Sequence, residues 1–213
     1  MKKRLLTMCA TLILFLLPGS AQADVVFNLL MEFSGGSQPA GFPPWLIATF
    51  ITLSPGTVEV RLQARLQSPS EFVNIWLFNL DPAFNPNNLS LAHVSGVPAA
   101  VTKGINAFRA DGDGYFDIKF DWPQNPPASR FGNDDLVVYH ITSAVHPIME
   151  TSFNFVSAPG GGQGMFPTAA HVQGVGPDGE ESGWIAVPEP ATLLTLGIGA
   201  TFFMTRRRRR RSG

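Results

Sequence analysis

The chain has 213 residues, with 15 basic and 16 acidic side chains and a formal net charge of −1. Nine of the 15 basic residues lie near the two ends, so the stretch 24–186 keeps 6 basic against 15 acidic residues, a net charge of −9. An acidic stretch of this length can bury one hydrophobic core, and it repels phosphates, which excludes nucleic acid as a partner. The single cysteine, Cys9, lies outside it, which excludes disulfides and thiolate metal sites within the stretch.

The N-terminus has the layout of a secretory signal peptide. Three basic residues at positions 2–4 precede an apolar run at 5–17. Ala21 and Ala23 then form a small-x-small cleavage pattern, which predicts a mature chain that begins at Asp24. Residues 1–23 are therefore predicted to be removed on export.

Strand-like segments follow one another through the stretch 24–186. The clearest is 57–66, where apolar residues alternate with polar ones over ten positions, as expected of a strand with one wet face. The segment 116–121 alternates in the same way after an Asp-Gly turn. Further strands are predicted at 25–33, 45–53, 72–80, 103–109, 136–142, 149–156, 169–173 and 184–186.

The segments between these strands carry the residues of turns and loops. Glycine, proline and asparagine gather at 34–44, 81–98, 122–129 and 157–167, and no helical period is sustained for three turns. Repeated short strands joined in this way predict an all-β fold, an antiparallel β-sandwich of jelly-roll or immunoglobulin-like type. Residues 24–186 are predicted to form this acidic domain.

An acidic turn is the first candidate for a metal site. Asp111, Asp113 and Asp117 are separated by glycines, and calcium prefers several hard oxygens from one tight loop. An EF-hand is excluded, because Trp122 occupies the position where the bidentate glutamate would stand. Two interpretations stay open: a plain hairpin turn with no cofactor, which we favour, or a weak calcium site completed by Asp121 or by residues 134–135.

Catalytic motifs are absent from the sequence. The four histidines lack the spacing of zinc ligands, and neither an HExxH motif, a Gly-x-Ser-x-Gly elbow nor a phosphate loop occurs. Pairs of carboxylates as used by glycoside hydrolases need no fixed spacing, so a secreted carbohydrate-active hydrolase stays open as an alternative. No catalytic residue is predicted, and the protein is expected not to be an enzyme.

Tryptophan offers a second kind of candidate site, because its ring can stack on the apolar face of a sugar. The four tryptophans are Trp45, Trp76, Trp122 and Trp184. Packing in the core is the favoured interpretation for such large apolar side chains. Trp122, beside Pro123 in a predicted loop, is the expected exception.

The C-terminal stretch 187–213 has three parts in order. A Val-Pro-Glu-Pro motif comes first, then an uncharged run at 191–205, then a basic cluster; the motif is Val187, Pro188, Glu189 and Pro190, and the cluster is Arg206, Arg207, Arg208, Arg209, Arg210 and Arg211. As a helix the uncharged run would reach about 22 Å, which spans a membrane if the bilayer thins slightly. Basic residues stay cytoplasmic, so the rest of the chain is predicted on the far side.

This tail closely resembles the PEP-CTERM sorting signal of Gram-negative bacteria. The resemblance implies that exosortase, a membrane-embedded cysteine protease, handles the chain near the motif while the helix holds it briefly in the inner membrane. Two segments of the domain, 110–121 and 169–174, also look like parts of PEP-CTERM cargo proteins. A plain membrane anchor is the rival interpretation of the tail.

The sequence thus predicts an exported, non-catalytic β-sandwich protein. By resemblance it would be sorted to the cell surface or extracellular matrix and would work among exopolysaccharides. A calcium-dependent polysaccharide-binding module and a secreted hydrolase remain the alternatives.

Overall fold

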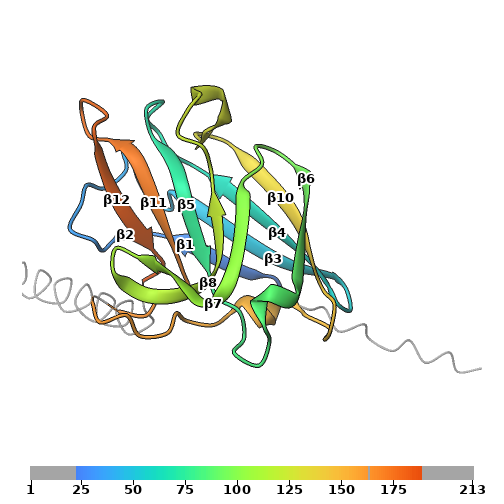
Figure 1. Ribbon diagram of the computed structural model, residues 1–213. Coiled ribbons are helices and arrows are strands. Elements are labelled where there is room, and N and C mark those ends of the chain that lie inside the picture. The colour runs from blue at the N-terminus through green and yellow to red at the C-terminus, as the bar shows by residue number, and fades with distance from the viewer. Residues whose placement is uncertain (1–22, 163, 189–213) are drawn as a thin grey trace, which may run out of the picture.

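The computed structural model describes residues 23–162 and 164–188, and within them the chain forms two antiparallel sheets packed face to face (Figure 1). Sheet A has the strand order β1-β3-β4-β10-β6, and sheet B has the order β2-β12-β11-β5-β8-β7, with β9 also paired to β5. The predicted all-β, antiparallel class is confirmed. The jelly-roll or immunoglobulin-like type stays a prediction.

The strands of sheet A are β1 (Val25–Leu29), β3 (Leu46–Ser54), β4 (Thr57–Ala64), β6 (Leu89–Ser95) and β10 (Leu136–Ser143). Those of sheet B are β2 (Met31–Glu32), β5 (Phe72–Phe78), β7 (Ala100–Ala110), β8 (Asp113–Asp121), β9 (Phe131–Gly132), β11 (Thr168–Val175) and β12 (Glu181–Ala186). Three short 3-10 turns complete the described elements: η1 (Pro86–Asn88), η2 (Pro127–Ser129) and η3 (Glu150–Phe153).

The first predicted strand, 25–33, is in fact two strands that belong to different sheets. β1 pairs with β3 in sheet A, whereas β2 pairs with β12 in sheet B. Leu30 lies at the crossing, where its amide donates to the carbonyl of Ala186 at 3.0 Å. The N-terminal strand pair therefore ties the two layers together at one edge.

Strand β4 shows why the alternation at 57–64 predicts a strand. Its apolar residues Val58, Val60, Leu62 and Ala64 are all fully buried between the sheets, while the residues between them lie on the outer face of sheet A. Burying a valine or leucine side chain contributes roughly 1.5–3 kcal/mol, so a one-residue slip would remove the whole set from the core.

Aromatic rings fill the space between the sheets. Phe50 of β3 stacks on Phe153 at 4.6 Å between ring centroids and meets Phe78 of β5 edge-on at 5.4 Å. Trp122 stacks on Phe131 at 4.6 Å in the same cluster. Contacts of this kind join residues from both layers, so the main core is one continuous body.

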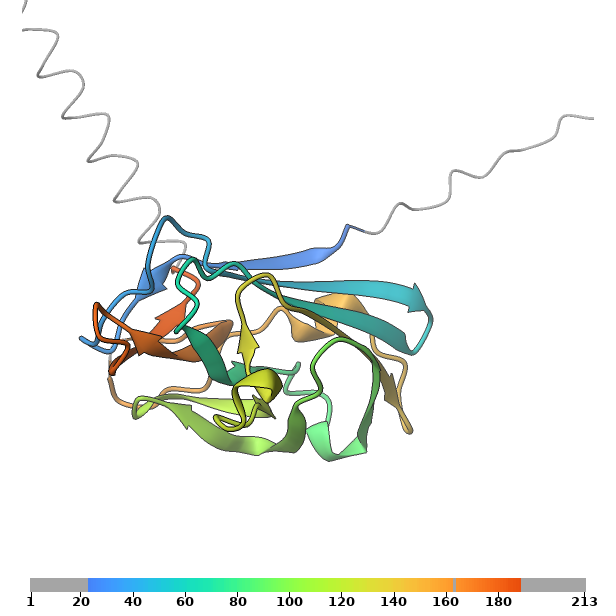
Figure 2. The same ribbon diagram turned by 90° about the horizontal axis from the view of Figure 1, so that it is seen from above.

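A second, smaller core lies on the other side of sheet B. The β7–β8 hairpin curls back over the outside of this layer, as Figure 2 shows. Its Phe116 packs there with Leu77 of β5 and with Phe166, which precedes β11. Part of the outer face of sheet B is thus covered by the protein's own hairpin and by the segment before β11.

Two predicted segments are corrected by the structure. The segment 149–156 is no strand: its centre is the 3-10 turn η3, in which the Ser152 hydroxyl accepts from the Met149 amide at 3.1 Å. Such local side-chain bonds compete with strand pairing. The predicted loop 81–98 contains η1 and strand β6, an edge strand whose residues are mostly exposed and so give no apolar pattern.

Candidate functional site

The C-terminal motif begins where the sandwich ends. Strand β12 ends at Ala186, which is fully buried, and Val187 packs against the main core. Pro188 is also buried. The sandwich and the motif are therefore joined without a linker.

The rest of the predicted tail lies outside the described residues. This holds for Glu189, Pro190, the uncharged run at 191–205 and the basic cluster at 206–211. Within 23–162 and 164–188, no helix is long and apolar enough to cross a membrane.

At the other end, the two residues that flank the predicted cleavage point are described. Ala23 and Asp24 are both exposed and immediately precede β1. Ala21 and the predicted signal peptide before it lie outside the described residues. The cleavage point stays a prediction, now placed at the exposed start of the sandwich.

The three aspartates of the acidic turn have separate surroundings. Asp111 is exposed at the tip of the β7–β8 hairpin with φ of 49°, while Asp113 is buried. Both carboxylate oxygens of Asp117 accept backbone amides, from Asn106 at 2.8 Å and from Leu80 at 3.0 Å. These bonds hold the hairpin against the end of β5.

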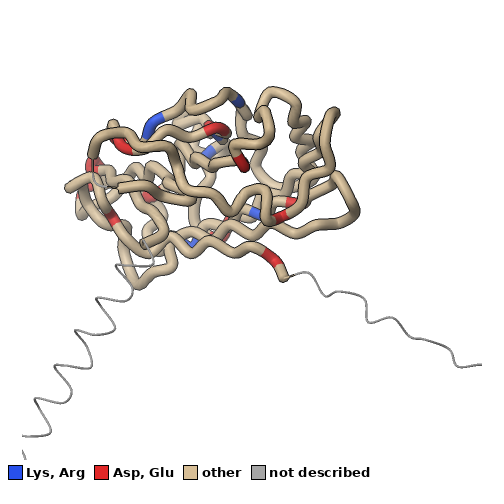
Figure 3. The backbone as a smooth tube through the Cα atoms, turned by 90° about the horizontal axis from the view of Figure 1, so that it is seen from below, with Lys and Arg blue, Asp and Glu red and all other residues tan. Residues whose placement is uncertain are grey.

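The residues considered as further calcium ligands also have protein partners. Asp121 contacts the Lys119 ammonium at 2.8 Å, and Asp135 accepts from the Gly132 amide at 2.8 Å. Across the described part of the chain, no three His, Cys, Asp or Glu residues form a group that could hold a metal ion. Figure 3 shows acidic positions spread over the molecule.

The burial of the four tryptophans differs from the prediction. Trp45, Trp76 and Trp122 are 2%, 0% and 1% exposed, and the Trp122 indole donates to the Val97 carbonyl at 2.9 Å. The prediction that Trp122 is the exception was wrong. Strand β8 ends at Asp121, so Trp122 directly follows the strand, before the proline, and its ring lies in the core. Trp184 of β12 is the one of the four that is only partly buried.

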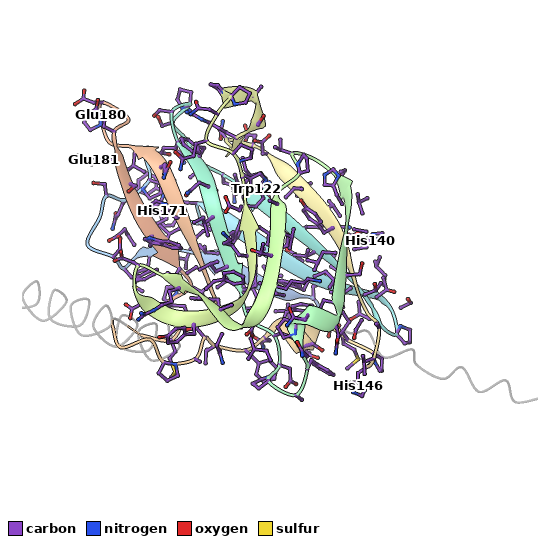
Figure 4. The ribbon with its side chains drawn as sticks, in the orientation of Figure 1. Trp122, His140, His146, His171, Glu180 and Glu181 are labelled. Carbon is purple, nitrogen blue, oxygen red and sulfur yellow. The ribbon has the colours of Figure 1, made fainter. Side chains whose placement is uncertain are left out.

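Trp184 belongs to a row of side chains on the outer face of sheet B. The strand register places Trp184 opposite His171, His171 opposite Ile75, and Ile75 opposite Asp121, across four neighbouring strands. The His171 and Trp184 rings are stacked at 4.9 Å between centroids with 26° between their planes. We call these four residues, with Asn74, the Trp184 row; Figure 4 labels His171 within it.

Asn74 joins the row because of a bulge in β5. The pairing of β5 with β11 shifts register between His171 and Val172, which leaves Asn74 as the extra residue. Its Oδ1 lies 2.8 Å from Nδ1 of His171, so in the neutral ring Nδ1–H donates and Nε2 is left as an acceptor. The bulge therefore fixes the orientation of the histidine.

The protonation of His171 follows from the same surroundings. Burial lowers the pKa of His171 below its ordinary value of 6.5, and the negative charge of Asp111 opposes part of that effect. The ring is accordingly held neutral near pH 7, with one acceptor nitrogen.

Sequence reasoning missed the row. It considered the histidines, His171 among them, only as zinc ligands, for which their spacing is wrong, and it did not consider Asn74. The available signal was that His171 and Trp184 each stand at an outward position of a short apolar strand. Which outward positions lie side by side depends on strand order, and strand order is not local in the sequence.

The outer face of sheet A carries a charged group instead. Glu59 accepts from Arg61 Nε at 2.7 Å and lies 3.1 Å from His140 Nε2. Burial alone raises the pKa of Glu59, but the hydrogen bonds from Arg61 and His140 outweigh it, so its pKa lies below the ordinary 4.5. This group stabilises a cross-strand contact on an open face.

Fold and termini together define a class: an antiparallel β-sandwich whose last strand continues directly into a C-terminal sorting segment. The family model of the PEP-CTERM protein-sorting motif matches residues 186–210. The chain thus carries a PEP-CTERM sorting motif, which supports its being an exosortase substrate, and the resemblance seen in the sequence is confirmed. The motif also marks it as an exported protein that passes through the membrane.

Among solved structures, one similar chain comes from biomass-sensing modules of Rsgi-like proteins of Clostridium thermocellum, described as resembling the family 3 carbohydrate-binding module of the cellulosome. The match has 10% identity and a TM-score of 0.37, and it covers 66% of this chain and 95% of that chain. A likeness this remote carries no functional argument. The curated proteins contain no significant match.

Proposed function

We propose that this protein is a non-catalytic cargo domain that exosortase cleaves at the 187–190 motif and passes to the cell surface or extracellular matrix. There it associates with exopolysaccharide. The membrane segment at 191–205 and the basic cluster at 206–211 serve as a temporary anchor in this proposal, with the cluster on the cytoplasmic side.

One observation supports the proposal above the others: the sorting motif follows the last strand of a folded domain without a spacer. Ala186 is paired in sheet B and Val187 packs against the core, so all of 24–186 is cargo. The net charge of −9 on that cargo suits a soluble protein outside the cell.

The mass of the mature protein, from native cells and from their medium, tests the proposal. In a strain with exosortase we expect a chain that starts at Asp24 and ends between Pro188 and Pro190. Deleting exosortase should abolish this product. A chain that keeps Arg206 to the end in both strains would mean a plain membrane anchor, and the proposal would fail.

A pair of matched variants separates motif recognition from general loss of acidity. Glu189→Gln changes the motif and should block processing. Glu180→Gln changes an exposed carboxylate in the turn before β12 and should be processed normally. Equal processing of the two variants would contradict a role for the motif carboxylate.

The proposed role needs no cofactor. At Asp117 and Asp135, calcium would have to compete with the backbone amides that these carboxylates already accept. We therefore expect the same thermal midpoint with excess calcium as with a chelator, since a ligand that binds only the folded state raises it. A midpoint that rises with calcium would revive the calcium-dependent alternative.

A further inference from the structure

The Trp184 row presents polar groups that the fold leaves without partners. Asn74 is 7% exposed, and its Oδ1 is bonded to His171, yet no described residue accepts from its Nδ2. Likewise no described residue accepts from the indole Nε1 of Trp184 or donates to Nε2 of His171. None of these three atoms is among the buried polar atoms that lack a partner, so each reaches solvent. An amide that is nine-tenths buried but keeps a free donor at the surface is suited to bind a ligand.

The contrast with two of the other tryptophans supports this interpretation, whereas the buried indole of Trp45 also lacks a hydrogen-bond partner. The indole of Trp76 donates to Thr168 Oγ1 at 2.8 Å, and that of Trp122 donates to a carbonyl at 2.9 Å. Buried tryptophans usually find such partners, because an unmet donor is costly. Trp184 stands on the surface beside a stacked histidine with its donor open.

The chemistry of the row matches a hydroxyl-rich ligand with apolar C–H faces. The stacked indole and imidazole supply an aromatic surface, and around it lie two donors and one acceptor fixed in direction by the sheet. Sugar rings combine these two features, since their C–H groups pack on aromatic rings while their hydroxyls donate and accept. We propose that the Trp184 row binds a neutral polysaccharide; this inference rests on the proposed extracellular role and deepens it.

The shape and charge of the surroundings select the class of saccharide. The row crosses four strands, a width of about 14 Å at the usual strand spacing, which suits an extended chain better than a single sugar. Asp121 ends the row and the charge of Asp111 is felt at His171. With the domain at −9, a polyanionic chain is repelled.

The opposite face of the molecule lacks these features. On the outer face of sheet A the polar groups of Glu59, Arg61 and His140 are bonded to one another. Of the described tryptophans, none lies there. His140 is therefore a matched control: a partly exposed histidine on a sheet face, which lies away from the row in Figure 4.

The test uses the mature protein purified from its native cells, run through native gels that contain hydroxyethylcellulose, laminarin or dextran, with alginate as the polyanion. We expect at least one neutral polymer to retard the protein and alginate not to. His171→Ala should weaken the retardation at least about tenfold, as loss of a central contact does. His140→Ala should leave it unchanged.

Trp184 packs beside the second core, so its removal could unfold the protein. Trp184→Phe keeps a six-membered ring there and removes the five-membered ring with its Nε1 donor, and it should bind more weakly than the wild type. Because the other three tryptophans are at most 2% exposed, protection from acrylamide quenching on adding the polymer reports on Trp184.

Each outcome is decisive. Retardation by a neutral polymer that is lost in His171→Ala and kept in His140→Ala supports the assignment. Retardation by none of the three, by alginate alone, or equally in both variants overturns it. Because binding is measured on purified protein, such a failure would leave the mass result, and with it exosortase sorting, standing.

Discussion

The two outer faces of the sandwich differ in what covers them. The outer face of sheet A is open, and its cross-strand neighbours, among them Glu59 and His140, partner one another. The outer face of sheet B is roofed at one end by the β7–β8 hairpin over a second core, and beside that roof lies the Trp184 row with its unmet polar groups. A sheet face that is partly covered by other segments has packed side chains and buried polar groups beside it, whereas an uncovered face is a solvated surface.

The largest expected difference between the faces concerns the second core. Phe166 is 1% exposed and its ring lies tilted against that of Phe33 at 4.4 Å between centroids, so Phe166→Ala should cost about 3–5 kcal/mol of unfolding free energy. Val26→Ala, on the outer face of sheet A with 49% exposure, should cost about 0.5 kcal/mol or less. Denaturant unfolding measures both. Similar losses would mean that the roofed face is not a core.

A smaller effect is expected from one buried hydroxyl. Thr168 is fully buried; its Oγ1 accepts from the Trp76 indole at 2.8 Å and donates to the Leu77 carbonyl at 2.6 Å. Thr168→Val leaves both groups unmet and should cost about 1–3 kcal/mol. Thr142→Val, at an exposed position of β10, is the matched control and should be nearly neutral in the same denaturant series.

The histidine of the Trp184 row should make stability depend on pH. Because its pKa is lowered on folding, the unfolded chain binds more protons below pH 6.5, and stability falls as pH drops through and below that value. His171→Gln should flatten this part of the curve of unfolding free energy against pH. An unchanged slope would show that the ring is as solvated as in the unfolded chain.

The smallest effect is expected on the open face, and it lies at lower pH. Since the pKa of Glu59 is lowered on folding, its contribution is present above pH 4.5 and is lost as pH falls through the folded-state value. Glu59→Gln should remove that loss and cost less than about 1 kcal/mol at neutral pH, as usual for a surface pair. A larger cost would mean that the two faces are equally critical.

The sequence predicted what local periodicity controls. The alternation at 57–64 placed every inward residue of β4 correctly, and that of β8 did so for Ile118 and Phe120. Phe116, at the same alternation, lies instead in the second core. Strand β8 pairs with β5 only from Ile118 to Asp121, so Phe116 lies beyond that pairing, where β8 pairs with the bulged part of β7, and no pattern within six residues encodes where the pairing ends.

The candidate sites also differ in whether local sequence or strand arrangement brings their residues together. The sorting motif is contiguous, so a local pattern could reveal it, and the family model matches the same segment at 186–210. The Trp184 row draws Asn74, His171 and Trp184 from three strands, and it exists only because β11 lies between β5 and β12. The strand predicted at 149–156 was wrong because the hydroxyls of Ser152 and of the distant Thr52 accept from the amides of Met149 and Glu150, and the segment forms a turn.

The position of β12 between β2 and β11 has a consequence for the timing of export. Among the described strands β2 pairs only with β12, so the earliest part of sheet B has no neighbour until residues 181–186 have arrived. A chain that emerges N-terminus first can therefore finish folding only when nearly the whole domain has crossed. The motif at 187–190 directly follows β12, so cleavage there would release a domain whose last strand has already crossed the membrane.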